Sequence, residues 1–240
     1  MAAPQNGQDG RDGQNGKNGQ DKIATPWAVT VQGATLVVSL PVPYRVLSWA
    51  PRNPGLVEAR TIINHHVNIK DPIPDEPTHS LMQHAQQLHL SFPVVGLMTG
   101  VSMERLVRQT EQLDALILEC CATVGLSNAL AVGDPATYEE RPGTINLIVL
   151  LDHPLTSGAM VEAISLVTEA KLQSLQAADV RSTVSHALAT GTGTDCIAIA
   201  CPPGKAAYHY CGKHTRLGEL LGRVVSAAVR EGIDKTQPNG

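Results

Sequence analysis

A chain of 240 residues with 42% hydrophobic residues can bury one sizeable core. Its formal net charge of -4 provides no positive field for nucleic acid or an anionic membrane, and the single Phe with 3% aromatic residues argues against a base-stacking surface. No apolar run approaches the roughly 18–20 residues of a membrane helix. The N-terminus also lacks the apolar segment that a secretory signal requires, so we expect no such signal.

The cysteines indicate a reducing compartment. There are five of them, an odd number, and none forms a CxxC pair. This pattern argues against a disulfide framework and against a zinc knuckle, so we expect free thiols, a cytoplasmic protein and no protein-bound metal.

The two ends of the chain differ in composition from the rest. Residues 1–22 are rich in Gly, Asn, Gln and Asp, and such a segment buries too little apolar surface to offset its ordering entropy. We therefore expect a disordered tail over residues 1–22, one domain over residues 23–234 and a frayed end over residues 235–240.

The domain alternates β-rich and helical segments. Residues 27–50 contain β-rich runs broken by Gly33 and Pro43, which predicts an antiparallel meander. Residues 78–90 have helical character. Short continuous apolar runs, typical of strands covered on both faces, occupy residues 93–99, 115–125, 144–152 and 196–201. With long helices over 156–178 and 215–231, we expect an α/β or α+β fold: a single layered domain whose mixed sheet is covered by helices.

The first long helix carries one residue that does not fit its pattern. Its apolar stripe consists of Met160, Ile164, Val167 and Leu175. Lys171 falls on this stripe, whereas Glu169 lies about 200° away from it around the helix. Lys171 therefore either extends outward from the edge of the stripe or lines a functional site.

The second long helix has a clear beginning and a stripe of small residues. Thr215 is a credible N-cap, Gly232 reads as a stop signal, and the small residues are Gly218, Gly222 and Ser226. Such a stripe allows close approach of a backbone or of a flat ligand. His214 would lie at the positive end of the helix dipole, which favours the neutral imidazole that can act as a base.

Two loops next to apolar runs carry polar side chains. Residues 189–195 form a glycine-rich loop that carries the hydroxyls of Thr190, Thr192 and Thr194 and ends at Asp195. The loop matches neither a Walker loop nor a dinucleotide fingerprint. It is therefore either an ordinary turn or a ligand-binding loop of another kind. Ser127 and Asn128 follow another run, where site residues gather. Because Gly125–Ala129 lacks the second glycine of GxSxG, a serine hydrolase is a weak interpretation.

The ordered set of segments resembles the adenosylcobinamide amidohydrolase family. The resemblance is carried by VGLSNALAVGD, GTINLIVLLDHPLTSGAMVEAISLVTEAK, ATGTGTD and YHYCGKHTRLGELLG, in this order. Upstream, ARTIINHHV is similar to the family's Ile-Asn-x-x-Val segment. The stretch 50–55 departs from the family, which usually carries adjacent glycines where Asn53-Pro54-Gly55 stand here.

The resemblance implies hydrolysis of adenosylcobinamide to adenosylcobyric acid and 1-aminopropan-2-ol, with a small-molecule corrinoid as the partner. No cofactor is expected, because the substrate carries its own cobalt. Neither nucleic acid nor membrane is expected to bind, and an oligomer is left open. Alternatives are a corrinoid-binding protein without turnover, or another acyl-transfer enzyme that is acylated on Ser127 or Thr192.

Amide hydrolysis requires attack on the carbonyl, stabilisation of the oxyanion and protonation of the departing amine. We assign stabilisation of the oxyanion to Lys171 and transfer of the proton to His214. Asp195 would either orient His214 or activate the attacking water, and Glu169 is an alternative base. Substrate-binding residues are then Asn64, Ser127, Asn128, Thr190, Thr192 and Thr194; the two asparagines suit the amide rim of the corrin.

Overall fold

Three antiparallel strands open the fold in the computed structural model, which describes residues 23–68, 76–136, 143–205 and 208–236. β1 (Ala28–Gln32) turns at Gly33, whose φ is +57°, into β2 (Thr35–Ser48), and β3 (Gly55–His66) pairs with β2. The predicted antiparallel arrangement is confirmed, but residues 27–50 supply its first two strands, and the third strand, β3, lies beyond the predicted range. Pro43 does not end β2 but coincides with a register shift between Ser39 and Tyr44. The predicted tail over residues 1–22 and residues 237–240 lie outside the described residues.

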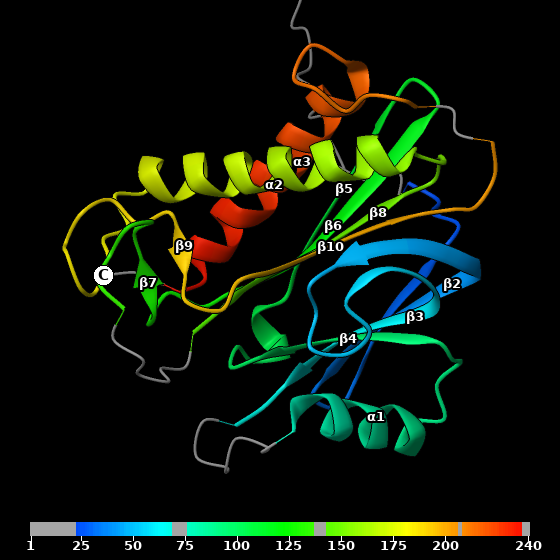
Figure 1. Cartoon of the computed structure of the whole chain (residues 1–240), viewed down its shortest axis with the longest axis horizontal. Helices are drawn as coiled ribbons and strands as arrows, with labels where there is room; N and C mark the ends of the chain where they lie inside the picture. The colour runs from blue at the N-terminus through cyan, green and yellow to red at the C-terminus, as the bar shows by residue number, and fades with distance from the viewer. Residues whose placement is uncertain (1–22, 69–75, 137–142, 206–207, 237–240) are drawn as a thin grey trace, which may run out of the picture.

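All the predicted apolar runs become strands of one mixed sheet (Figure 1). The eight strands follow the order β4-β3-β2-β10-β8-β6-β5, with β1 beside β2. The pairs β8–β10 and β3–β4 are parallel and the others are antiparallel. The further strands are β4 (Val94–Thr99), β5 (Val107–Leu113), β6 (Leu116–Val124), β8 (Ile145–Leu151) and β10 (Cys196–Cys201). The expected fold class, a mixed sheet covered by helices, is therefore confirmed.

Two long helices cover one face of the sheet. α2 (Ser157–Ala177) and α3 (Arg216–Asp234) pack over β6, β8 and β10, as Figure 1 shows. Each helix begins where the sequence predicts, since Thr156 accepts a hydrogen bond from the backbone of Ala159 and Thr215 accepts one from Gly218. The shorter α1 (Pro77–Gln87) covers the β3–β4 end, and a 3₁₀ turn spans Met103–Arg105. None of the helices in the described part of the chain is long and apolar enough to cross a membrane.

The sheet curls, so that strands distant in its order face each other. Asn64 on β3 donates to Thr123 on β6 and accepts from Asn146 on β8, at 2.9 and 2.8 Å. Two strands separate β3 from β8 in the sheet. The concave side therefore encloses a second core, which includes Tyr44 and Ile148.

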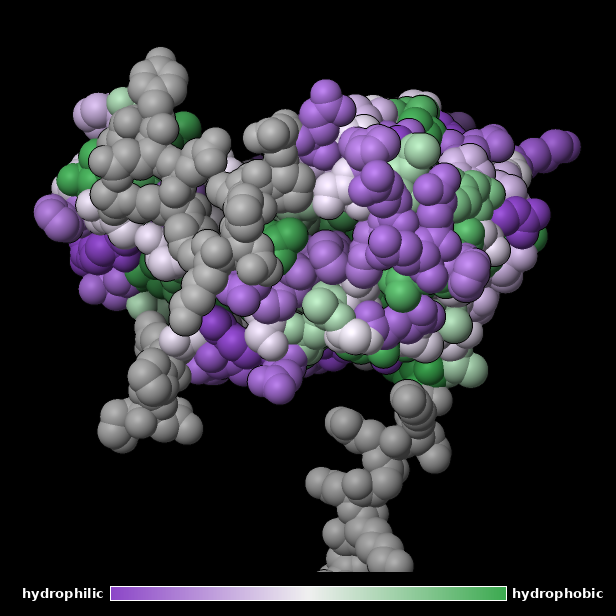
Figure 2. All heavy atoms as spheres, turned by 90° about the horizontal axis from the view of Figure 1, so that it is seen from below, coloured by the Kyte–Doolittle hydropathy of each residue, from purple (hydrophilic) through white to green (hydrophobic). Residues whose placement is uncertain are grey.

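On the face of the molecule in Figure 2, hydrophobic residues are scattered among hydrophilic ones wherever grey atoms do not cover it.

The small residues of α3 serve packing at two positions. A Cβ at Gly218 would overlap the backbone of Gly212, and one at Gly232 would overlap the side chain of Val124. The helix accordingly continues through Gly232 to Asp234, so the predicted stop at this glycine is wrong: its missing side chain lets the helix approach β6. A Cβ at Gly222 would meet nothing within 4 Å.

The five cysteines, Cys120, Cys121, Cys196, Cys201 and Cys211, are all free and buried. Burial, with smaller contributions from neighbouring carboxylates, raises the pKa of Cys196 and of Cys211 to about 12. The thiols therefore stay protonated at neutral pH.

Candidate active site

A buried ion pair joins α2 to the loop that precedes β10. Lys171 Nζ contacts Asp195 Oδ2, and the two side chains are only 7% and 10% exposed. Lys171 thus does not extend outward from the edge of its helical stripe: it lies inside, opposite a carboxylate. A buried charge is tolerated when it is paired and hydrogen-bonded, so this geometry supports the interpretation of Lys171 as a residue that lines a site.

The second oxygen of Asp195 is held by three donors. Its Oδ1 accepts the backbone N–H of Ile145 at 3.2 Å and that of Thr192 at 3.1 Å, together with the Thr192 hydroxyl. The indole of Trp49 donates to the backbone carbonyl of Asp195 at 2.7 Å. These bonds fix the carboxylate at the point where β8 and β10 begin.

A glycine makes room for the ion pair. A Cβ on Gly191 would lie 2.7 Å from Lys171 Nζ and still closer to Asp195 Oδ2. Gly191 belongs to a two-stranded ribbon in which β9 (Gly191–Thr192) pairs with β7 (Ala129–Leu130). The ribbon ties the loop after β6 to the loop before β10, and so brings the two polar segments of the sequence together.

The ion pair lies at a pocket of about 590 Å³. Among the described residues that line it, Lys171 and Asp195 are the charged ones, Thr168, Thr190 and Thr192 bring hydroxyls, and Leu130, Val132 and Leu172 bring apolar surface. Apolar surface with a few convergent polar and charged groups is typical of a small-molecule site.

Comparison with known proteins places the chain in a family. A family model described as adenosylcobinamide amidohydrolase matches residues 21–239. This chain belongs to the adenosylcobinamide amidohydrolase family. It is 30% identical over 227 residues to an uncharacterised protein of Methanocaldococcus jannaschii, covering 84% of this chain and 86% of the relative. It is also 31% identical over 150 residues, 58% of each chain, to a protein of Halobacterium salinarum named adenosylcobinamide amidohydrolase.

Among solved structures, one from Pyrococcus horikoshii OT3 aligns over 87% of this chain and 82% of its own. The TM-score is 0.42 and the identity is 10%.

The structure does not bring Glu169 or His214 into the pocket. Glu169 lies on the exposed side of α2, where it pairs with Lys213. His214 is exposed beside the N-terminus of α3, and its imidazole lies next to Gly212. The described partners of the Asp195 carboxylate are Lys171, Ile145 and Thr192, so Asp195 does not orient His214 here. The shuttle that we assigned to His214 therefore has no support from this geometry.

The loop residues divide between two places. Thr190 lines the pocket of the ion pair, and its hydroxyl accepts the N–H of Val132 at 2.9 Å. Thr194 instead donates to the carbonyl of Gly143 at 3.2 Å. Asn128 is 7% exposed and packs its amide against Gly193, where a Cβ would lie only 2.8 Å from it. Thr194 and Asn128 thus hold the loops around the site.

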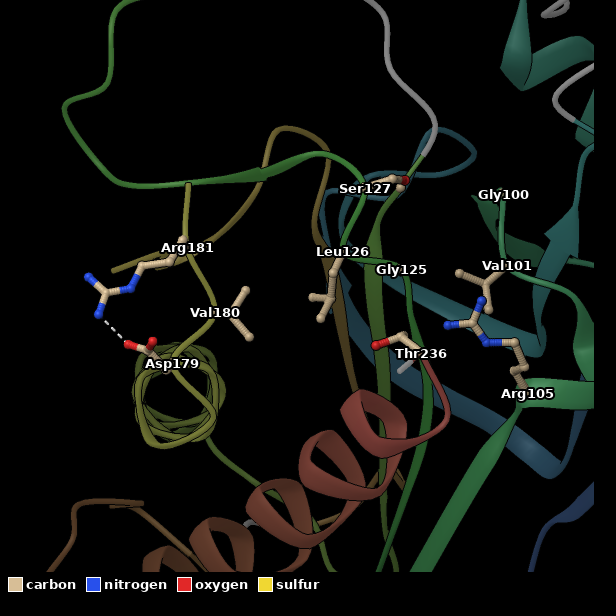
Figure 3. A pocket seen from close by; sticks show the side chains of 11 residues that line it. Gly100, Val101, Arg105, Gly125, Leu126, Ser127, Asp179, Val180, Arg181 and Thr236 are labelled. Carbon is tan, nitrogen blue, oxygen red and sulfur yellow. Dashed lines mark hydrogen bonds and ion pairs between the residues drawn. The ribbon is translucent and has the colours of Figure 1, made fainter. Parts of the chain in front are cut away.

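Ser127 lines a different pocket, of about 520 Å³ (Figure 3). Leu126 and Val180 also line it, and Figure 3 shows Arg105 and Arg181 on opposite sides. Arg181 is paired with Asp179, and both are exposed. Ser127 is thereby separated from the Lys171–Asp195 pair, which lines the first pocket.

Asn64 is 1% exposed, and its amide is bonded to Thr123 and Asn146 inside the curled sheet. It lines neither of the two pockets. The expectation that Asn64 binds the corrin rim is therefore not supported: its hydrogen bonds hold the two halves of the sheet together.

Sequence reasoning missed three contributions to the site: the close approach at Gly191, the backbone N–H of Ile145 and the indole of Trp49. Only the first left a signal, a glycine in a loop that can approach a ligand.

Beside the ion pair, burial and the charge of Asp195 raise the pKa of Cys196 to about 12, which makes this thiol a poor nucleophile. No group of three or more potential metal ligands occurs within the described ranges.

The arrangement can perform acyl chemistry. An ammonium has three hydrogens, of which Asp195 engages one, so Lys171 can donate to an oxygen that becomes negative. Asp195 can accept a proton from a group that attacks. Because both side chains are buried, their charges act more strongly than in water.

Proposed function

We propose that this chain hydrolyses the amide that links 1-aminopropan-2-ol to adenosylcobinamide, giving adenosylcobyric acid and the free amino alcohol. Membership of the family supports the reaction class. The observation that carries the proposal is the buried Lys171–Asp195 pair at a pocket with threonine hydroxyls. A protein that only binds a corrinoid does not need a paired ammonium and carboxylate in such a place.

Lys171 stabilises the oxyanion in this proposal. Three backbone donors of the loop are already used: the N–H of Gly193 bonds to Asn128 O, that of Thr190 to Leu130 O and that of Thr192 to Asp195. Lys171 is the cation that lines the pocket in the described part of the chain. Loss of one such donor lowers kcat by about 10²–10³-fold.

Asp195 is the proton acceptor and donor. Its carboxylate lies between Lys171 and the Thr192 hydroxyl, so a proton released by the attacking group can pass to Asp195 and then to the departing nitrogen. Because hydrolysis consumes only water, we expect neither ATP nor a bound cofactor to be needed, and the cobalt remains part of the substrate. We assign the reaction to the cytoplasm on the strength of the free cysteines.

The test is a direct assay. Purified protein is incubated with adenosylcobinamide, with and without ATP, and the products are separated and then identified and quantified by mass spectrometry. We expect adenosylcobyric acid and 1-aminopropan-2-ol in equal amounts under both conditions, formed at least about 100-fold more slowly by Lys171→Met and Asp195→Asn. Tight binding without product would instead identify a corrinoid-binding protein, and product only with ATP would contradict a simple hydrolase.

A further inference from the structure

Three hydroxyl groups line the pocket of the ion pair, and they differ in what they contact. Thr168 donates to the carbonyl of Ile164, one turn earlier in α2, at 2.8 Å. Thr190 accepts a backbone N–H from Val132. Thr192 is the one of the three whose hydroxyl is bonded to the Asp195 carboxylate. A hydroxyl becomes a useful nucleophile when a base can take its proton, and Thr192 has that base.

Ser127 is the rival hydroxyl from the sequence, and its position disfavours it. It lines the second pocket, which includes neither Lys171 nor Asp195. Acylation of Ser127 would therefore lack the cation and the carboxylate that line the first pocket.

Thr192 and Lys171 contact the two oxygens of one carboxylate, Oδ1 and Oδ2. A carbonyl carbon within reach of the Thr192 hydroxyl can therefore place its oxygen on the side of the ammonium. The N–H groups of Ile145 and Thr192 hold Oδ1 in place, so the hydroxyl faces an oriented acceptor. Such fixed orientation is the main requirement for intramolecular attack.

We infer that Thr192 is the nucleophile of the proposed hydrolysis and carries the adenosylcobyryl group as an ester. Thr192 Oγ1 bonds to the amide carbon while its proton passes to Asp195, and the carbonyl oxygen becomes an oxyanion that faces Lys171. The C–N bond then breaks, and the nitrogen takes the proton from Asp195 and leaves as 1-aminopropan-2-ol.

Water completes the cycle. It bonds to the ester carbon and gives a proton to Asp195, and the bond from carbon to Thr192 Oγ1 breaks. The oxygen of Thr192 takes the proton back, and adenosylcobyric acid leaves. Each proton that Asp195 accepts is returned in the same half-reaction, so no further acid or base is needed.

This inference rests on the proposed function, and amide exchange tests it separately. The enzyme is incubated with unlabelled adenosylcobinamide and deuterated 1-aminopropan-2-ol, and the molecular mass of the remaining substrate is measured by mass spectrometry. An ester intermediate transfers its acyl group to the labelled amine, so we expect label in adenosylcobinamide before hydrolysis is complete. A parallel incubation that starts from adenosylcobyric acid should give no labelled amide. Acid without exchange overturns the covalent step alone, whereas absence of acid overturns the proposed function as well.

Variants locate the acylated residue. Thr192→Ala should lose at least about 10⁴-fold in kcat, of the order found when a catalytic nucleophile is removed, and should lose exchange. Thr192→Ser keeps the hydroxyl and should restore both to within about tenfold. Thr30→Ala, at an exposed threonine of β1, is the matched control and should behave as the wild type. If Thr192→Ala exchanges normally, or if Ser127→Ala abolishes exchange while Thr192→Ala does not, Thr192 is not the nucleophile.

Discussion

Gly191→Ala isolates the geometry of the ion pair from its chemistry. The substitution adds one methyl group and removes no charge or hydrogen bond. Its Cβ would lie 2.7 Å from Lys171 Nζ, whereas ordinary van der Waals contact begins at 3.4 Å. The ammonium must therefore move by at least about 0.7 Å, and the carboxylate of Asp195, which is still closer to the Cβ, must move as well.

A displacement of about 1 Å in a catalytic group can cost about 10²-fold in rate. We therefore expect Gly191→Ala to lower kcat for adenosylcobinamide by roughly 10- to 100-fold. The KM should change less, because the methyl group displaces the reacting groups and leaves the apolar surface near Leu130 and Val132 in place. Steady-state hydrolysis, followed by formation of adenosylcobyric acid, measures both constants.

Gly222→Ala provides the matched control. This glycine lies within α3, and its Cβ would meet nothing within 4 Å. Alanine there should leave kcat unchanged and raise the free energy of unfolding by about 0.5–1 kcal/mol, because glycine is the poorer helix former. A Gly191→Ala enzyme with the kcat of the wild type would refute the claim that the position of the ion pair limits the reaction.

Two further predictions concern stability. In Lys171→Met, loss of the ammonium leaves Asp195 buried without its cation, which should lower the free energy of unfolding by about 3–5 kcal/mol in urea titrations. The double variant Lys171→Met/Asp195→Asn should recover part of the loss. Burial, with His84 and His66 nearby, lowers the pKa of His65 to about 4. An unfolded histidine binds its proton near pH 6.5, so stability should be complete above that pH and should fall as the pH drops towards 4, by on the order of 1–2 kcal/mol after allowance for partial exposure. His65→Gln should flatten this dependence, and an equally steep curve in the variant would assign the loss to other groups.

Local patterns in the sequence predicted the elements that bury apolar surface. The run of residues 144–152 became β8, and the stripe that includes Lys171 became the buried side of α2. These predictions succeed because periodicity and continuous hydrophobicity are local properties of the chain. β5 was missed because its residues, VRQTEQL, are mostly polar, and the two-residue strands β7 and β9 are too short to leave a pattern.

The site could be predicted only in part, because its partners come from distant segments. The sequence marked Lys171 and Asp195 separately, but the ion pair depends on how α2 packs against β10. Asn64 looked like a ligand-binding residue because nothing local shows that β3 curls towards β6 and β8. His214 was placed correctly at the start of α3, but its separation from Asp195 is a property of the whole fold.

The burial of all five cysteines has a practical consequence for work on this protein. Alkylating reagents react with exposed thiolates, so the folded chain should be almost inert to them, while the unfolded chain offers five targets. Pulsed alkylation therefore reports the unfolded fraction without any engineered probe. For the same reason, a single cysteine introduced on the surface, at a position such as Thr30, should take up a fluorophore selectively, and a distance to the bound corrinoid could then be followed by energy transfer.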